Sequence, residues 1–346
     1  MAVTEAKYLI FLVVSIIRSA EAALVEMWTV YYRQGLAIIS DYKERIFSWY
    51  RFVMGPDTEN NGDSVASKLF GTLNGFMRKF LFRILSVGPV PNHLAFILDG
   101  NRRYAKKWKL QEGTGHKCGF WALMSILKYC NELGVKYVTI YAFSIDNFKR
   151  RPNEVQYVMD LMHEKIEGLL KEESIMNQYG VRVYFIGNLK LLPERVRVVA
   201  EKAMKATENN KNTVLLICVA YTSTDEIVHA AQESCQHEWD EIQAMKASES
   251  NDGGEIISNE NQEEHRFINL VDLEKYFYMG VAPDVDILFR TSGETRLSNF
   301  LLWQTSTCLL YSPRALFPEL GLRHLVWSVL NFQRVYPYLE RRRKQV

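Results

Sequence analysis

Short apolar runs alternate with helical segments after residue 90, and this alternation is the strongest constraint on the fold. The expected strands are residues 94–98, 137–143, 181–186, 214–220 and 285–289. Between them, a helix over 120–133 is expected to end at Gly134, and Pro193 opens a helix that runs to about Thr207. Such alternation is typical of a largely parallel sheet covered on both faces. We therefore predict an α/β fold with a largely parallel central sheet flanked by helices.

The first of these runs ends abruptly in Asp99, which is followed by Gly100, Asn101, Arg102 and Arg103. Ligands of α/β proteins bind at the carboxyl ends of the strands, where Asp99 is expected. A carboxylate there can hold Mg²⁺, and Gly100 lets the backbone approach a ligand closely. The asparagine and the two arginines supply donors that suit phosphate oxygens. The segment predicts a site for a metal-bound diphosphate.

Residues 285–304 repeat this pattern, with an apolar strand followed by Arg290, a Ser-Gly turn, Arg296 and Ser298. Two strand ends that both open into arginines and small donors indicate two anionic groups held side by side. A single arginine cluster is more often a solvated surface or a set of ordinary ion pairs, so neither segment is decisive alone.

Composition argues against other classes of protein. The chain has 42 Lys and Arg against 40 Asp and Glu, so no global field attracts nucleic acid, and we predict no nucleic-acid partner. Its 5 cysteines are scattered, which argues against a disulfide framework or a zinc site and favours a reducing, cytosol-facing environment. A length of 346 residues suits one enzyme domain with appendages.

Residues 1–55 are predicted to form a membrane-associating helical segment. Its apolar run, residues 8–17, is shorter than the roughly 20 residues that span a bilayer, and Arg18 and Glu21 interrupt the sequence after it. The run could be the apolar region of a signal peptide, but no convincing cleavage site comes after it. We favour an uncleaved helix, and whether it spans the membrane or lies on it stays open.

A flexible linker is predicted at 56–66, and an amphipathic helix at 67–90. Apolar residues recur in the helix at helical spacing, while Lys68, Arg78, Lys79 and Arg83 supply positive charge. Such a helix can lie on an anionic membrane or pack on the enzyme domain, and different faces can do both.

Two segments of the predicted enzyme domain, residues 91–340, carry separate signals. Residues 246–265 are polar, acidic and Gly-containing, which predicts a disordered insertion. The segment from Glu154 to Leu170 is predicted to be a helix with one apolar stripe. The stripe consists of Val155, Val158, Met159, Met162, Ile166 and Leu169. Taken alone, the stripe indicates a helix that faces the core.

Three motifs together resemble one known family. They are residues 99–103, YAFSIDNFKR at 141–150 and RTSGETRLSN at 290–299, and they have the order and spacing of the cis-prenyltransferases. Within that family the chain most resembles the plant enzymes of the dehydrodolichyl diphosphate synthase and rubber-related type. The similarity runs from about residue 85 to about residue 340, apart from a variable stretch near 236–265.

The resemblance implies a catalytic subunit that condenses isopentenyl diphosphate onto an allylic diphosphate, with farnesyl diphosphate expected. The product would be a long-chain polyprenyl diphosphate with Z double bonds, of the dolichol or the rubber type. In the family, the helix after Glu154 helps to line a hydrophobic tunnel for the growing chain, which flexible Met and aliphatic side chains suit.

The resemblance also implies residue roles. Asp99 would bind Mg²⁺, and Ser144 and Asn147 would lie near the proton that is lost, with Asn147 orienting substrate or relaying the proton. The implied substrate-binding residues are Gly100, Asn101, Arg102, Arg103, Tyr104, His116, Phe148, Arg150, Arg290, Arg296, Leu297 and Ser298. Of these, Arg290, Arg296 and Ser298 would hold isopentenyl diphosphate. On sequence alone, His116 could equally be a capping residue.

The chain departs from the family's bacterial homodimeric pattern at several positions. Glu112 replaces an arginine, and Thr295 and Leu309 stand where that pattern has His and Glu metal ligands. The metal site would then be incomplete or simplified, because Leu309 cannot bind Mg²⁺.

The last residues read YPYLERRRKQV and lack the family's Arg-x-Gly ending. The resemblance therefore implies a homologous accessory subunit that supplies this ending, in a hetero-oligomer at the cytosolic face of the endoplasmic reticulum membrane. Arg341–Arg343 could instead form only a charged tail. Two other functions stay open, an accessory scaffold subunit and a nucleic-acid binder, although intact Asp99 and the balanced charge oppose them.

Overall fold

The computed structural model describes residues 65–111, 113–171, 176–177, 179–249 and 269–345. The chain forms two compact units, Met1–Val87 and Gly88–Val346. The predicted N-terminal segment 1–55 and most of the linker 56–66 lie outside the described residues, as do residues 250–265 of the predicted insertion.

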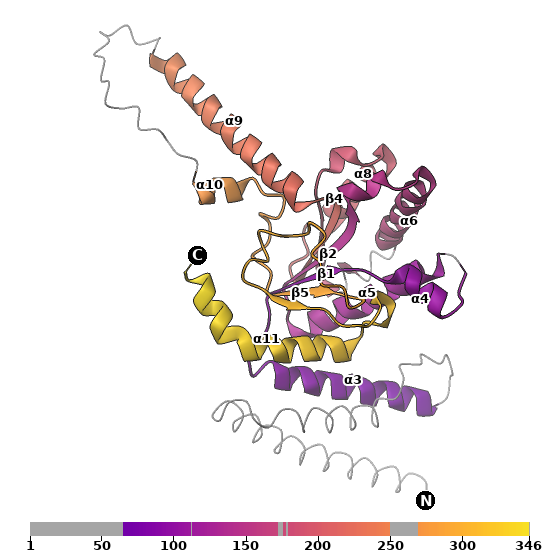
Figure 1. Cartoon of the computed structure of the whole chain (residues 1–346). Coiled ribbons are helices and arrows are strands. Elements are labelled where there is room, and N and C mark those ends of the chain that lie inside the picture. Colours follow the sequence, from indigo (N-terminus) through magenta and orange to yellow (C-terminus); the bar gives the residue numbers. More distant parts are fainter. Residues whose placement is uncertain (1–64, 112, 172–175, 178, 250–268, 346) are drawn as a thin grey trace, which may run out of the picture. The chain divides into compact units, whose positions relative to one another are not determined.

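The second unit is built on a six-stranded sheet (Figure 1). Its strands are β1 (His93–Ile97), β2 (Tyr137–Ser144), β3 (Val181–Ile186), β4 (Thr213–Tyr221), β5 (Ile287–Arg290) and β6 (Leu309–Tyr311). Their order is β3-β4-β2-β1-β5-β6, and every neighbouring pair is parallel. The predicted parallel α/β fold is confirmed. Leu309, which stands at the position of a metal ligand in the bacterial pattern, begins β6 and pairs with Ile287.

The central strands consist mostly of apolar residues because both faces of a parallel sheet are covered. All five residues of β1 and all nine of β4 are buried. Phe96 of β1 stacks on Phe289 of β5 with ring centroids 4.5 Å apart, so these two strands are tightly joined in the core. This burial explains why the strands read as continuous apolar runs rather than as alternating patterns.

Helices connect the strands. They are α4 (Asn101–Lys107), α5 (Thr114–Leu133), α6 (Pro152–Lys171), α8 (Glu194–Ala206), α9 (Ser223–Glu249), α10 (Leu270–Lys275) and α11 (Leu322–Arg343), with short 3-10 turns η1 (Ile145–Lys149), η2 (Leu189–Leu191) and η3 (Phe317–Glu319). Gly134 ends α5 in the left-handed region, with φ of 88°, as predicted. Figure 1 shows α5 and α11 side by side beneath the sheet, while α9 projects away from it.

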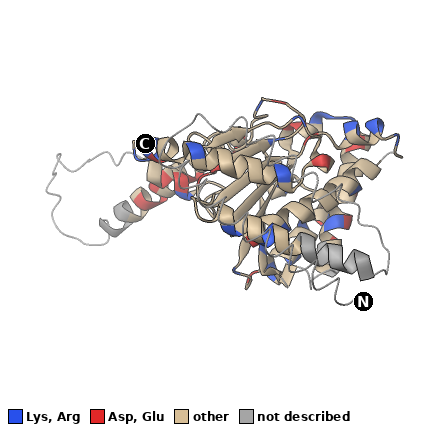
Figure 2. Ribbon diagram, turned by 90° about the horizontal axis from the view of Figure 1, so that it is seen from below, with Lys and Arg blue, Asp and Glu red and all other residues tan. Residues whose placement is uncertain are grey.

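Helix α9 begins at Ser223. It continues to Glu249, so the prediction of disorder is wrong for residues 246–249. Figure 2 shows Asp and Glu along this projecting helix. Its sequence includes Glu233, Glu238 and Asp240. The polar composition of residues 246–249 does not indicate disorder, because a solvent-exposed helix needs few apolar side chains.

The apolar stripe of α6 is only partly buried. Met159 and Ile166 are buried, whereas Val155, Val158 and Met162 are half-buried. A purely core-facing role therefore fits two of these five side chains, and three retain accessible apolar surface.

Helix α3 (Val65–Leu85) belongs to the first unit. Phe82 and Leu85 are buried, while Phe76 is exposed and Arg83 lies near the end of the helix. Among the helices of the described residues, none is long and apolar enough to cross a membrane.

An ion pair holds α11 at the amino-terminal edge of the sheet. Arg343 Nη2 lies 2.8 Å from Asp286 Oδ1 and donates to the carbonyl of Val285. Asp286 Oδ2 also accepts from the backbone of His93, whose pKa burial lowers to about 4. The interpretation of Arg341–Arg343 as only a charged tail is therefore wrong for Arg343.

Candidate active site

The two predicted arginine clusters meet at one edge of the sheet. Asp99 comes after β1 and Arg290 ends β5, and these strands are neighbours in which Ile97 pairs with Arg290. Arg290 Nη2 lies 3.0 Å from Asp99 Oδ2, and its Nη1 donates to Ser298 Oγ at 3.0 Å. One guanidinium thus joins the carboxylate of the first cluster to the hydroxyl of the second.

Burial and charge oppose one another at Arg290. The residue is 6% exposed, and burial lowers the pKa of its guanidinium, while the Asp99 carboxylate acts in the opposite direction. Its Nε is buried and has no hydrogen-bond partner in the described part of the chain. A buried cation of this kind requires anionic neighbours, which Asp99 provides.

Sequence reasoning did not select Glu294, which pairs with two arginines of this site. Arg103 lies 3.3 Å from Asp99 Oδ1 and 3.5 Å from Glu294 Oε1, and Arg296 also pairs with Glu294. The sequence did carry a signal for this residue, because Glu294 stands between Arg290 and Arg296 in the motif. The site therefore contains alternating positive and negative groups rather than arginines alone.

The loop after β1 is held by the loop after β5. Thr291 Oγ1 and Ser292 Oγ donate to the carbonyl of Asp99 at 2.7 Å and 2.9 Å. Gly100 has φ of 111°, and a Cβ there would lie 2.5 Å from Ser292 Oγ and 3.0 Å from a methyl group of Leu316. Protein side chains thus come close at Gly100, and the approach of a ligand there stays a prediction.

The remaining residues of the first cluster lie on α4 and α5. Arg102 is exposed and 4.0 Å from Glu154 of α6, and Tyr104 is half-buried. His116 lies in the first turn of α5, where burial and then the charge of Arg102 lower its pKa. Its ring meets Tyr157 of α6 edge-on, with centroids 6.4 Å apart. A neutral imidazole here can accept or donate a hydrogen bond.

Ser144 and Asn147 form a capping box at the end of β2. Ser144 Oγ accepts from the backbone of Asp146 at 3.1 Å, and Asn147 Oδ1 accepts from the backbone of Ser144 at 3.3 Å. Phe148 packs edge-on against buried Phe143. These contacts are all local in the chain.

Arg150 ends the η1 turn and is exposed, and in the described part of the chain no ion pair joins it to Asp99. Arg296 is also exposed on its loop. Leu297 packs against the core cluster, while Ser298 takes a positive φ of 52°. Tyr141 donates to the carbonyl of Ser298 at 3.4 Å, which fixes this strained turn to the sheet.

A buried carboxylate behind the site fastens the second loop. Glu226 is fully buried, and its oxygens accept from Tyr221 Oη at 2.6 Å, Gln304 Nε2 at 3.0 Å and the Met279 backbone at 2.8 Å. Burial raises the pKa of this carboxyl. Met279 and Gln304 bracket the segment that carries Arg290, so Glu226 fixes that segment at both ends.

Within the described residues, no group of three or more His, Cys, Asp or Glu side chains could hold a metal ion. Asp99 is the carboxylate at the strand edge, and its side chain is 29% exposed. Magnesium commonly uses one or two carboxylates together with waters and substrate phosphates, so this donor set suits a metal bound jointly with a diphosphate.

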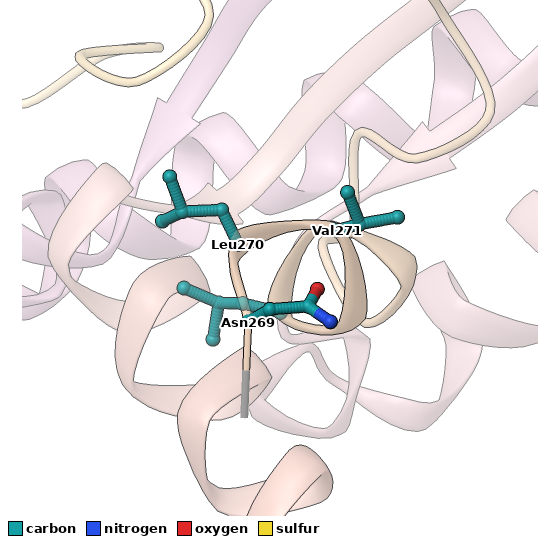
Figure 3. A pocket seen from close by; sticks show the side chains of 4 residues that line it. Asn269, Leu270 and Val271 are labelled. Atoms are coloured by element: carbon teal, nitrogen blue, oxygen red, sulfur yellow. The ribbon is translucent and has the colours of Figure 1, made fainter. Parts of the chain in front are cut away.

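A hollow of about 600 Å³ lies elsewhere, beside α10 (Figure 3). It is lined by Asn269, Leu270, Val271 and Leu273, and Leu270 and Val271 are exposed. None of these side chains is charged, so the described lining offers no cation to a diphosphate.

The fold and the site define an α/β protein whose strand ends present arginines and a carboxylate suited to phosphate-bearing ligands. Residues 97–340 match the family model described as "Putative undecaprenyl diphosphate synthase". A solved structure of lavandulyl diphosphate synthase from Lavandula x intermedia, in complex with dimethylallyl diphosphate, superposes with a TM-score of 0.57. It is 28% identical and covers 70% of this chain and 95% of its own.

Full-length relatives are more similar. Dehydrodolichyl diphosphate synthase CPT3 of Solanum lycopersicum is 59% identical over 82% of this chain and 98% of its own. Rubber cis-polyprenyltransferase HRT2 of Hevea brasiliensis is 57% identical over 80% of this chain and 95% of its own. The Homo sapiens dehydrodolichyl diphosphate synthase complex subunit DHDDS is 40% identical over 77% of this chain and 74% of its own. The chain belongs to the cis-prenyltransferase family, as its motifs predicted, and it is a prenyltransferase.

Proposed function

We propose that the chain is the catalytic subunit of a cis-prenyltransferase that condenses isopentenyl diphosphate onto an allylic diphosphate, with farnesyl diphosphate as the primer. Each condensation would add one Z double bond and lengthen a polyprenyl diphosphate of the dolichol or the rubber type. The observation that carries this proposal is the Arg290 guanidinium, which bridges Asp99 of one strand end and Ser298 of the other loop.

Two diphosphates need two neighbouring groups of donors. On the allylic side we assign Gly100, Asn101, Arg102, Arg103, Tyr104, His116, Phe148 and Arg150, and on the isopentenyl side Arg290, Arg296, Leu297 and Ser298. Arginines stabilise the pyrophosphate leaving group more as its charge grows, which favours the transition state over the ground state. The contact between Arg290 and Asp99 supports adjacency of the two groups.

Asp99 would hold Mg²⁺ together with oxygens of the allylic diphosphate. When bound, the ion would supply positive charge that stabilises the departing pyrophosphate. One feature supports this role: the Asp99 carboxylate lies at the strand edge and is partly accessible.

Carbon–carbon bond formation leaves a proton on C2 of the isopentenyl unit, and this proton must be removed. We assign Ser144 and Asn147 to the neighbourhood of that carbon, where an amide and a hydroxyl can orient substrate or relay the proton towards pyrophosphate. Their capping box would keep both side chains in one arrangement.

We further propose a homologous accessory subunit that supplies an Arg-x-Gly ending, and attachment to the cytosolic face of the endoplasmic reticulum membrane. The human relative's description as a complex subunit supports a partner. The basic and apolar sequence of α3, with residues 1–55 before it, supports contact with an anionic membrane surface.

The test is incorporation of labelled isopentenyl diphosphate by the full chain with Mg²⁺ and farnesyl diphosphate, alone and with a co-expressed accessory subunit. We expect Asp99→Ala to abolish incorporation, while Asp160→Ala on the exposed face of α6 retains it. Thermal unfolding checks that both variants are folded. Full incorporation by Asp99→Ala would contradict the proposal, and the product lengths would identify the product class.

A further inference from the structure

The side chain of Asn101 rests directly on a glycine of α5. A Cβ added at Gly119 would lie 2.3 Å from Asn101 Oδ1 and 3.1 Å from Cδ1 of Phe317. Real Cβ atoms essentially never approach another atom within 3.0 Å. The Asn101 amide can therefore occupy this position only because residue 119 lacks a side chain.

The contact leaves a polar atom of Asn101 unsatisfied. Its Oδ1 is buried and has no hydrogen-bond partner in the part of the chain that the structure describes. Turning the amide over leaves the same deficit, because oxygen and nitrogen have similar size and both need partners. An unpaired buried amide is costly, and proteins retain such costs mainly where the group has a functional position to keep.

The position of that amide is set by its place in the chain. Asn101 is the first residue of α4 and comes directly after Gly100, so it lies beside the Asp99–Arg290 pair in sequence and at the same sheet edge. The residue as a whole is only half-buried. The amide oxygen is thus packed against α5, while the residue as a whole keeps some accessible surface.

Gly115, one turn earlier on α5, has a different role. A Cβ there would lie 2.1 Å from the backbone carbonyl of Asn101 and 3.2 Å from the Cβ of Ala105. Gly115 therefore allows the α4 backbone to approach α5 closely, whereas the nearest atoms at Gly119 belong to the Asn101 side chain. Gly115 thus bears on the position of the α4 backbone, whereas Gly119 bears on the position of the Asn101 amide.

We propose that Gly119 is a positioning residue that holds the Asn101 amide in register for the diphosphate of the allylic substrate. This inference rests on the proposed function, because Asn101 is assigned to that diphosphate. An alanine at 119 would push the amide off α5 and out of the orientation in which it donates to a phosphate oxygen.

The test is a double-mutant cycle on the full chain, assayed with its accessory subunit where activity requires one. Steady-state kinetics are measured for the unmodified protein, Gly119→Ala, Asn101→Ala and the double variant. We expect each single variant to raise the KM for the allylic diphosphate about tenfold, the effect of losing one hydrogen bond to a charged group. The KM for isopentenyl diphosphate should stay unchanged, and the double variant should be no worse than Asn101→Ala.

A matched control separates this effect from a general change in helix stability. Gly168 lies on α6, and among the described residues no neighbouring atom lies within 4 Å of a Cβ added there. Gly168→Ala should therefore leave both KM values unchanged. If Gly119→Ala fails to fold, the double variant should fold, because the shorter residue at 101 removes the closest contact.

Three results would overturn the inference. The first is an unchanged KM for the allylic diphosphate in Gly119→Ala, and the second is an equal rise in this KM from Gly119→Ala with Asn101 and with alanine at that position. The third is a double variant that is as unfolded as Gly119→Ala. Incorporation of isopentenyl diphosphate by the unmodified protein tests the proposed function separately. An active parent with an additive cycle would reject the role of Gly119 alone.

Discussion

Replacement of Glu226 by glutamine tests whether the buried carboxylate fixes the second substrate loop. The change keeps the shape of the side chain but converts one acceptor oxygen into a donor. If the remaining oxygen accepts from Tyr221 and Gln304, the new NH₂ group faces the backbone N–H of Met279. One buried bond is lost and two donors oppose each other, which should lower the free energy of unfolding by about 1–3 kcal/mol.

The loss should depend on pH in a defined direction. Burial raises the pKa of Glu226, so the folded protein binds this proton more tightly than the unfolded chain does. As the pH rises from the ordinary glutamate value through the raised value, the free energy of unfolding of the parent falls. Glutamine does not titrate, so the variant has no such loss at this position. The difference between the two proteins should therefore be largest at low pH and shrink as the pH increases.

Urea unfolding at pH 5 and pH 8 measures this difference, and steady-state kinetics at pH 8 measure the consequence for the site. Because Met279 and Gln304 bracket the segment that carries Arg290, we expect the KM for isopentenyl diphosphate to rise, with tenfold for about each 1.4 kcal/mol lost in binding. Glu233→Gln, an exposed change on the same helix, is the control. A stability difference that grows with pH, or a rise confined to the allylic KM, would refute the reasoning.

Three other changes probe separate parts of the molecule. Arg290→Lys should reduce kcat/KM about 10-fold to 100-fold, because one ammonium group cannot reach both Asp99 and Ser298 as the planar guanidinium does. A reduction of kcat/KM by less than about twofold would contradict this. Arg343→Ala should lower the free energy of unfolding by about 2 kcal/mol, since the largely buried Asp286 loses its partner; an unchanged thermal midpoint would show that the pair is dispensable. Lowering the pH from 7 to 5 should cost about 2 kcal/mol at His93, because its pKa falls from 6.5 to about 4 on folding and its stabilisation is lost as pH decreases between these values. Urea unfolding of the parent and His93→Gln at both pH values checks this, and identical pH dependence in the two proteins would exclude His93 as the cause.

The meeting of Asp99 and Arg290 could be predicted because both residues end apolar strands. The carboxyl ends of parallel strands share one edge of the sheet, so any two such ends are candidates for one site. Sequence does not state which strands are neighbours, and β1 and β5 are far apart along the chain. Their direct pairing is what brings the two arginine clusters within hydrogen-bonding distance.

Glu226 could not be found in the same way. In sequence it is one of two acidic residues in the first turn of α9, where a carboxylate ordinarily interacts with the helix dipole in solvent. Only tertiary structure reveals that three donors from separate segments enclose it. The short strand β6 escaped prediction for a related reason, because three residues carry too little periodicity to separate a strand from a loop.

Gly100 shows the limit of a correct local argument. Its positive φ and the absence of a side chain permit a close approach by Ser292 and Leu316, while the approach of a ligand stays a prediction. A glycine in a loop thus indicates that something comes near without indicating what does. Here the effect on the site is indirect, since packing against Ser292 holds the Asp99 carbonyl and thereby the first turn of α4.

The internal ion pairs of the site bear on how a diphosphate would bind. Three arginines, 103, 290 and 296, contact two carboxylates, Asp99 and Glu294, which leaves a formal charge of 3 − 2 = +1. A diphosphate must therefore exchange some carboxylate–guanidinium contacts for phosphate–guanidinium contacts rather than fill an open cationic pocket. Exposed Arg296 and half-exposed Arg103 can turn to a ligand at small cost, whereas buried Arg290 is fixed on Asp99 and Ser298. Arg290 therefore sets the geometry of the site while the two outer arginines supply the adaptable contacts, so binding should weaken with salt mainly through the outer pair.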